Sequence, residues 1–102
     1  MFRVTSRLLD CRVTLFMRAN CSLCDTAKAV VGKVNQNRPL SYSEINVMEP
    51  GQEGWKSVYE FDTPVIHVDK GTSPETTTSS RKLMHRFEEA DVQALMDAVE
   101  AS

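Results

Sequence analysis

Two cysteines separated by two residues, Cys21 and Cys24, lie where a hydrophobic segment gives way to a helical pattern. Residues 12–17 form a short apolar run, which predicts a strand covered on both faces. After the cysteines, apolar residues recur every three or four positions, which predicts a helix with one buried side. These positions are Cys24, Ala27, Val30, Val31 and Val34. The chain is therefore expected to form a strand followed at once by a helix, with both thiols near the turn between them.

The position of the two thiols at the start of a helix suggests their chemistry. A pair with this spacing can interconvert between dithiol and disulfide, which is a transfer of two electrons. The first turn of a helix has unpaired backbone N–H groups and a partial positive charge, and both favour a thiolate. We therefore predict that Cys21 is a nucleophile.

The next segments continue the alternation of strands and helices. Residues 40–47 predict a second strand, and a strand–helix–strand order requires a parallel pair with a right-handed crossover. Pro50 is placed to open a second helix that carries Trp55 and Tyr59. Residues 64–68 predict a third strand.

The C-terminal part of the chain predicts a hairpin and a closing helix. Residues 83–87 are the expected antiparallel partner of the third strand. Residues 70–81 are rich in Thr and Ser, which predicts an exposed, mobile loop without a core face. Helical spacing marks the last helix at Val92, Leu95, Met96 and Val99. The predicted fold is α/β with the order βαβαββα, a central four-stranded mixed sheet flanked by helices, in one domain over residues 1–102.

Composition excludes several classes of protein. A net charge of −2 and a pI near 5.6 leave no broad basic surface for nucleic acid. No apolar run approaches the roughly 18 residues of a membrane span. Three cysteines are an odd number for a secreted disulfide framework, so we expect a soluble, cytoplasmic monomer in which Cys11 is a small buried residue or a regulatory thiol. Residues 1–10 are a ragged N-terminus or a weak targeting segment, which keeps the mitochondrial matrix as an alternative location.

Two motifs extend these expectations to a family. Residues 15–25 read LFMRANCSLCD, residues 62–66 read DTPVI, and about forty residues separate Cys24 from Pro64. In this combination the chain resembles a glutaredoxin-like protein of the thioredoxin-fold superfamily, from Cys11 to Glu100. The resemblance implies a thiol–disulfide oxidoreductase that acts on protein or glutathione disulfides. It further implies glutathione as a co-substrate, or a donor of the thioredoxin reductase type, and neither a metal nor a tightly bound cofactor.

The resemblance also implies roles for individual residues. Arg18 matches a basic residue that the family has three positions before the first cysteine. Pro64 matches a cis-proline that faces the cysteine pair, and Thr63 would then offer its backbone N–H and C=O to an extended substrate or to glutathione. Cys24 is close enough to Cys21 to resolve a mixed disulfide.

The chain departs from the family pattern at two places. Typical glutaredoxins have a pair of glycines before the last helix, at the glutathione site, whereas residues 84–91 contain no glycine. Arg86 is the candidate to bind a carboxylate there instead. Ser22 replaces the usual proline after the first cysteine, and its hydroxyl is able to donate a hydrogen bond to a thiolate.

Three other interpretations of the cysteine pair stay open. Cys21 and Cys24 have the right composition for a zinc site together with His67 and His85. An iron–sulfur cluster shared by two subunits and glutathione would use Cys21. A non-catalytic adaptor would bind its partner through the groove beside Pro64.

Overall fold

The computed structural model describes residues 10–102, so the prediction about the N-terminus falls almost wholly outside the described part of the chain. The elements follow the predicted order βαβαββα. They are β1 (Cys11–Met17), α1 (Ser22–Asn37), β2 (Ser41–Asn46), α2 (Glu53–Tyr59), β3 (Val65–Lys70), β4 (Arg81–Met84) and α3 (Glu89–Glu100).

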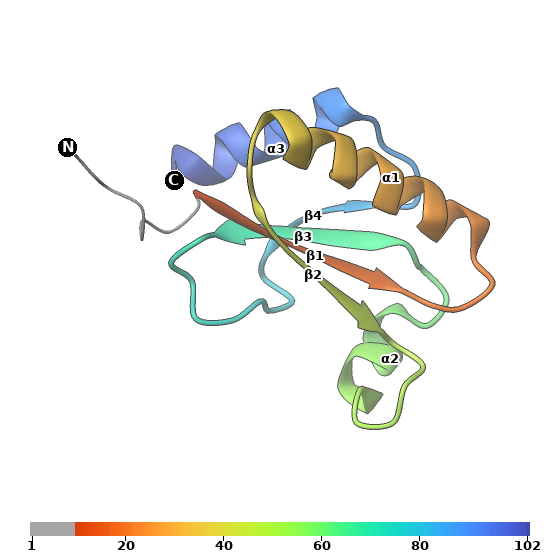
Figure 1. Cartoon of the computed structure of the whole chain (residues 1–102). Coiled ribbons are helices and arrows are strands. Elements are labelled where there is room, and N and C mark those ends of the chain that lie inside the picture. The colour runs from red at the N-terminus through yellow and green to blue at the C-terminus, as the bar shows by residue number, and fades with distance from the viewer. Residues whose placement is uncertain (1–9) are drawn as a thin grey trace.

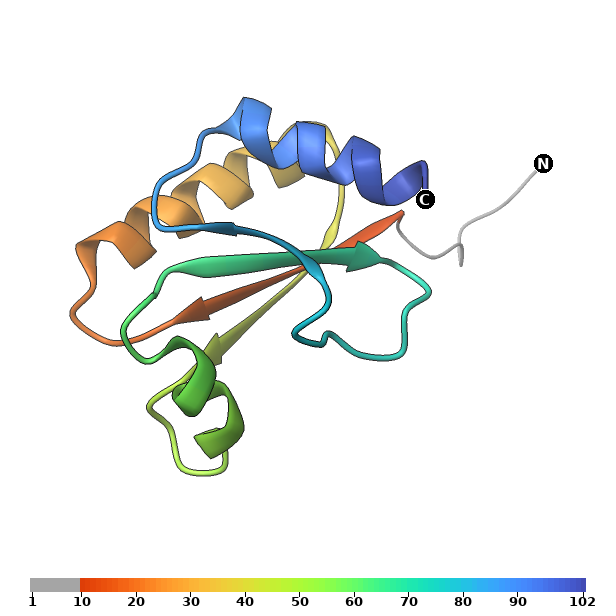
Figure 2. The ribbon, with the colours of Figure 1, turned by 180° about the vertical axis from the view of Figure 1, so that it is seen from behind.

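The four strands form one mixed sheet in the order β2-β1-β3-β4. The β1–β2 pair is parallel, as the strand–helix–strand pattern predicts, and β3 is antiparallel to both β1 and β4. Figures 1 and 2 show α1 and α3 together on one face of the sheet, while α2 lies on the other side near the end of β1. The predicted fold class is therefore confirmed.

The larger core fills the space between the sheet and the α1–α3 layer. Strand β1 contributes Cys11, Val13 and Leu15, because alternate side chains point to the same face of a sheet. The predicted stripe of α1 meets the predicted stripe of α3, where Val92, Met96 and Val99 are buried. None of the helices within residues 10–102 has both the length and the apolar composition to cross a membrane.

A smaller, aromatic core lies under α2. The ring of Phe16 is fully buried and lies 4.6 Å from the rings of both Trp55 and His67, measured between centroids. Tyr59 is also buried, and its hydroxyl is hydrogen-bonded to Nε2 of His67 at 2.6 Å. The contacts that Trp55 and Tyr59 make with β1 and β3 therefore hold α2 against the sheet.

The loop between β3 and β4 is mostly exposed, as predicted for residues 70–81, but it also contacts the core. The Thr76 hydroxyl is hydrogen-bonded to Nδ1 of the buried His67 at 2.8 Å. Ser80 donates to Asp69 at 2.5 Å, and Arg12 donates to the Ser73 carbonyl at 2.8 Å. Figures 1 and 2 place this loop on the same side of the sheet as α2. The expectation that this loop has no core face was wrong, because hydroxyl side chains, which are typical of solvated loops, here bind polar groups of strand β3.

Two predicted boundaries also need correction. Helix α2 begins at Glu53, because Pro50 belongs to the turn before it. Strand β4 ends at Met84 and does not reach Phe87, because His85 has a φ of 66° and turns the chain out of the sheet. That left-handed conformation is one that glycine adopts far more easily than other residues.

Replacing His85 with glycine should stabilise the protein. A residue with a side chain loses about 1–2 kcal/mol in the left-handed region, whereas the entropic cost of glycine is about 0.5–1 kcal/mol. His85→Gly should therefore raise the free energy of unfolding by about 0.5–1 kcal/mol, measured by urea denaturation. His85→Ala is the matched control, since it also removes the ion pair with Asp62 but keeps Cβ. Equal stability of the two variants would contradict the backbone explanation.

Candidate active site

The cysteine pair lies at the N-terminus of α1, as predicted. Asn20 has a φ of 59° and closes the turn after β1, and Cys21 then takes an extended conformation as the N-cap residue. The Cys21 carbonyl accepts the first helical hydrogen bond from the Asp25 N–H at 3.2 Å, and its Sγ accepts one from the Cys24 N–H at 3.1 Å. A helix N–H therefore points at the Cys21 sulfur, which is the arrangement that stabilises negative charge there.

The two cysteines differ in their access to solvent. They form a disulfide, with their Cα atoms 5.2 Å apart. Cys24 is 3% exposed and lies within the first turn of α1, whereas Cys21 is half-buried. A substrate arriving from solvent therefore meets Cys21 first.

A hollow of about 460 Å³ opens next to Cys21. It brings together Cys21, Arg18 and Thr63, three of the residues that the sequence motifs predicted for one site. Pro64, the residue after Thr63, is buried, and the Thr63–Pro64 peptide bond is cis, which confirms the predicted cis form of this proline. The other lining residues are Asn20, Ser22, Leu23, Glu60 and Phe61.

Arg18 connects two of the segments that form this hollow. Its Nη1 donates a hydrogen bond to the Glu60 carbonyl at 2.8 Å, which ties the turn after β1 to the end of α2. Its guanidinium therefore binds backbone, while its positive charge lies in the lining of the hollow that contains Cys21. A fixed cation at this position favours a thiolate and an approaching anion.

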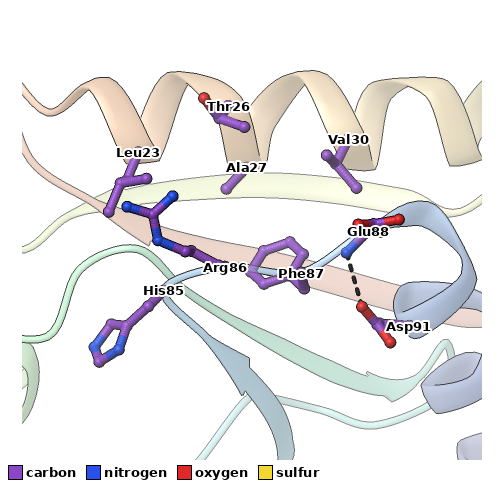
Figure 3. A pocket seen from close by; sticks show the side chains of 9 residues that line it. All are labelled: Leu23, Thr26, Ala27, Val30, His85, Arg86, Phe87, Glu88 and Asp91. Atoms are coloured by element: carbon purple, nitrogen blue, oxygen red, sulfur yellow. Dashed lines mark hydrogen bonds between the residues drawn. The ribbon is translucent and has the colours of Figure 1, made fainter.

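A second hollow, of about 480 Å³, lies between α1 and the segment that joins β4 to α3. Figure 3 shows Leu23, Ala27 and Val30 descending from α1, with Arg86 and Phe87 rising from the opposite side. Leu23 lines both hollows, so the two lie on either side of this residue, which stands between the two cysteines in the sequence.

Arg86 is the free cation of the second hollow. Its guanidinium is turned toward Leu23 in Figure 3. The ion pairs of lysine and arginine found within residues 10–102 are formed by Lys28 and Arg38, not by Arg86. The acidic residues of this hollow are already engaged, because Glu88 and Asp91 form a capping box with the backbone of α3. An anionic group entering the hollow would therefore meet Arg86.

The histidines do not complete a metal site with the cysteines. Both ring nitrogens of His67 are hydrogen-bonded, to Tyr59 and Thr76, on the other face of the sheet. His85 lies 3.6 Å from the Asp62 carboxylate. Within the described residues, no three side chains of His, Cys, Asp or Glu converge as metal ligands. The arrangement of ligands therefore does not fit the zinc interpretation.

Sequence reasoning gave no role to four residues that line the Cys21 hollow, which are Asn20, Leu23, Glu60 and Phe61. Leu23 sits between the cysteines and was part of the motif, but the motif assigns no role to this position. Glu60 contributes through its carbonyl, which no sequence pattern reveals. Phe61 had one signal, since it is an aromatic residue just before the DTPVI motif and after the last apolar position of α2.

The sheet order, the cis-proline and the cysteine pair at the start of α1 define a protein of the thioredoxin fold. Solved structures agree with this class. Chloroplastic thioredoxin z has a TM-score of 0.68 at 13% identity, with 91% of this chain and 80% of that chain covered. Thioredoxin O2 from Arabidopsis thaliana, in its oxidized state, has a TM-score of 0.62 at 14% identity, with 89% and 76% covered. Protein Ne2328 from Nitrosomonas europaea has a TM-score of 0.61 at 19% identity, with 89% and 95% covered.

Within this class, the sequence matches the model of one family over residues 12–97, which is most of the chain. The chain belongs to the family described as Glutaredoxin-like domain (DUF836).

Proposed function

We propose that this protein is a thiol–disulfide oxidoreductase that works through Cys21 and Cys24. The observation that carries the proposal is the asymmetry of the pair. A half-buried Cys21 receives a helix N–H and faces a hollow, while its disulfide partner Cys24 is buried behind it. A nucleophile has to be reachable by substrate, whereas a resolving thiol has to reach only the nucleophile.

The reaction proceeds in two exchanges. The Cys21 thiolate attacks one sulfur of a substrate disulfide, forms a mixed disulfide, and releases the other sulfur as a thiolate that takes a proton. Cys24 then loses its proton to solvent and attacks the Cys21 sulfur, which forms the Cys21–Cys24 disulfide and releases the second substrate thiol. Two electrons and two protons have passed to the substrate. An external thiol or dithiol donor returns the pair to its reduced form.

Substrate binding next to Cys21 would use the backbone of Thr63. Within residues 10–102, its N–H and C=O make no backbone hydrogen bond, although Thr63 lines the hollow. An extended peptide pairs with such groups as it would with the edge of a sheet. Thr63 is the platform in this proposal, and Pro64 beneath it exposes that backbone.

Glutathione is the proposed thiol donor, and Arg86 would bind one of its carboxylates in the second hollow. A charge-assisted hydrogen bond of this kind contributes about 1 kcal/mol or more at a partly exposed site. Arg86→Gln should therefore raise the KM for glutathione about five- to tenfold in a steady-state assay. Turnover with dithiothreitol, which has no carboxylate, should stay the same. Arg81→Gln is the control, because Arg81 is an exposed arginine outside this hollow.

A redox titration tests the proposed function directly. The protein is equilibrated with mixtures of reduced and oxidised glutathione, its free thiols are alkylated, and the products are read by mass spectrometry. We expect one two-electron transition that involves Cys21 and Cys24 and leaves Cys11 unchanged. A pair that stays oxidised or stays reduced over the whole range, with no mixed disulfide on Cys21, would favour the binding-only alternative.

A further inference from the structure

Phe61 is an aromatic side chain left in solvent at the candidate active site. It is 89% exposed, compared with 41% for Val58, 38% for Met48 and 37% for Met84, the other exposed large apolar residues within the described chain. It also lines the hollow that contains Cys21. Large apolar side chains that protrude at the edge of a hollow are typical of binding surfaces.

The fold itself does not need this side chain. Phe61 follows the end of α2 and belongs to neither hydrophobic core. The aromatic contacts that hold α2 come from Trp55 and Tyr59. Because Phe61 is almost fully exposed, its removal changes little apolar burial within the monomer. A role in stability therefore does not account for a phenylalanine at this position.

We propose that Phe61 is a specificity-determining residue that selects polypeptide disulfides with an apolar side chain next to the reacting cysteine. The inference rests on the proposed oxidoreductase function and names its substrate class. It extends the site beyond the residues that the sequence motifs predicted, because no motif assigns a role to Phe61.

The residues around Phe61 indicate which class of substrate would bind next to it. Thr63, two residues further along the chain, presents free backbone groups to the same hollow, which suits an extended polypeptide. Leu23 is a second apolar residue in this lining, so an apolar side chain beside the attacked sulfur has two apolar neighbours. A substrate without such a side chain, glutathione disulfide for example, would leave Phe61 in solvent. The selection therefore favours polypeptides over small disulfides.

Paired peptide substrates test the inference. Two disulfide-bonded peptides differ only in the residue that follows the cysteine, Leu in one and Ser in the other, and kcat/KM is measured with dithiothreitol as donor. The wild-type protein should prefer the Leu peptide about tenfold, as expected for burial of one large apolar side chain. Phe61→Ala should lower that preference to less than about twofold. Phe61→Leu, which keeps an apolar side chain, should retain most of it.

The controls separate this inference from the proposed function. Val58→Ala removes an exposed apolar residue of the same helix region that does not line the Cys21 hollow, and it should leave the preference unchanged. Reduction of 2-hydroxyethyl disulfide, which has no apolar side chain beside the reacting sulfur, gives the reference rate for each protein, and both peptide rates are divided by it. The role of Phe61 would be overturned if the wild type and Phe61→Ala showed the same ratio of kcat/KM for the Leu and Ser peptides, while both still reduced the small disulfide through Cys21. Loss of all Cys21-dependent reduction would instead overturn the proposed function, and the inference with it.

Discussion

Replacing Cys21 with serine should abolish disulfide exchange. The hydroxyl of serine is not ionised at neutral pH and does not form a disulfide, so the first covalent step is lost. We expect a fall in rate of about three orders of magnitude or more, as is usual when a nucleophile is removed. Release of thiol from a peptide disulfide, measured under pseudo-first-order conditions with dithiothreitol as donor, checks this result.

Replacing Cys24 with serine should give a different outcome. Cys21 still attacks the substrate, but the mixed disulfide has no internal thiol to resolve it. Mass spectrometry of Cys24→Ser after mixing with a peptide disulfide should therefore show one peptide attached through Cys21. If both variants retained activity, or if the adduct formed on another residue, the assigned roles of the two cysteines would be wrong.

Cys11 offers a matched control for both variants. It is fully buried in the larger core, and burial, reinforced by Glu100, raises the pKa of its thiol to about 11. The thiol therefore stays protonated and out of reach of solvent at neutral pH. Cys11→Ser should keep the exchange rate of the wild type, because the Met96 carbonyl and the Glu100 carboxylate, which lie near the thiol, are able to accept a hydrogen bond from the serine hydroxyl. A loss of exchange that exceeds the loss of folded protein would show that Cys11 takes part.

The second large effect concerns the stability of the protein in mild acid. Burial, reinforced by the charge of Lys82, lowers the pKa of His67 to about 4. An unfolded chain would titrate this histidine near 6.5. Above pH 6.5 His67 is neutral in the folded and in the unfolded state, so its lowered pKa does not change the free energy of unfolding. Between pH 6.5 and 4 the unfolded state binds the extra proton, so the free energy of unfolding falls by about 3 kcal/mol from this group.

Urea denaturation of the oxidised protein at a series of pH values measures this loss. Trp55 is the single tryptophan of the chain and lies 5.6 Å from the His67 ring, so its fluorescence reports on this core. His67→Gln keeps a donor and an acceptor but does not titrate. Between pH 6.5 and 4, the free energy of unfolding of this variant should fall by about 3 kcal/mol less than that of the wild type.

A second histidine variant makes this comparison specific. His85→Gln changes the other histidine of the chain, which is exposed and outside the aromatic core, and it should retain the loss of about 3 kcal/mol that His67 causes. The explanation through His67 would be untenable if His67→Gln and the wild type lost stability in parallel, since carboxylates shared by both proteins would then account for the whole effect.

The order of elements and the cysteine site were predictable because both depend on local patterns. Helical spacing after Cys24 has one consistent interpretation, and a strand–helix–strand segment has one favoured hand. Pro64 in the cis form followed from its motif and is confirmed. The end of β4 was not predictable, because nothing local to His85 indicates that this residue adopts the left-handed conformation.

The loop over residues 71–80 shows the limit of composition. Thr76 and Ser80 look like solvated loop residues, but their hydroxyls bind His67 and Asp69 of strand β3. Which polar group is buried depends on where the sheet places it, and the partner that satisfies it comes from a segment nine or eleven residues away.

The sequence by itself determined the fold class, the position of the thiols at a helix N-terminus and the candidate pair of Thr63 and Pro64, because near neighbours along the chain carry this information. The tertiary structure alone decided that Arg18 binds the Glu60 carbonyl, that Leu23 lines two hollows and that Phe61 is exposed at the hollow next to Cys21. These features bring the turn after β1 close to the end of α2. They also bring α1 close to the segment before α3. Their partners are more than thirty residues apart, and packing of the whole domain brings them together.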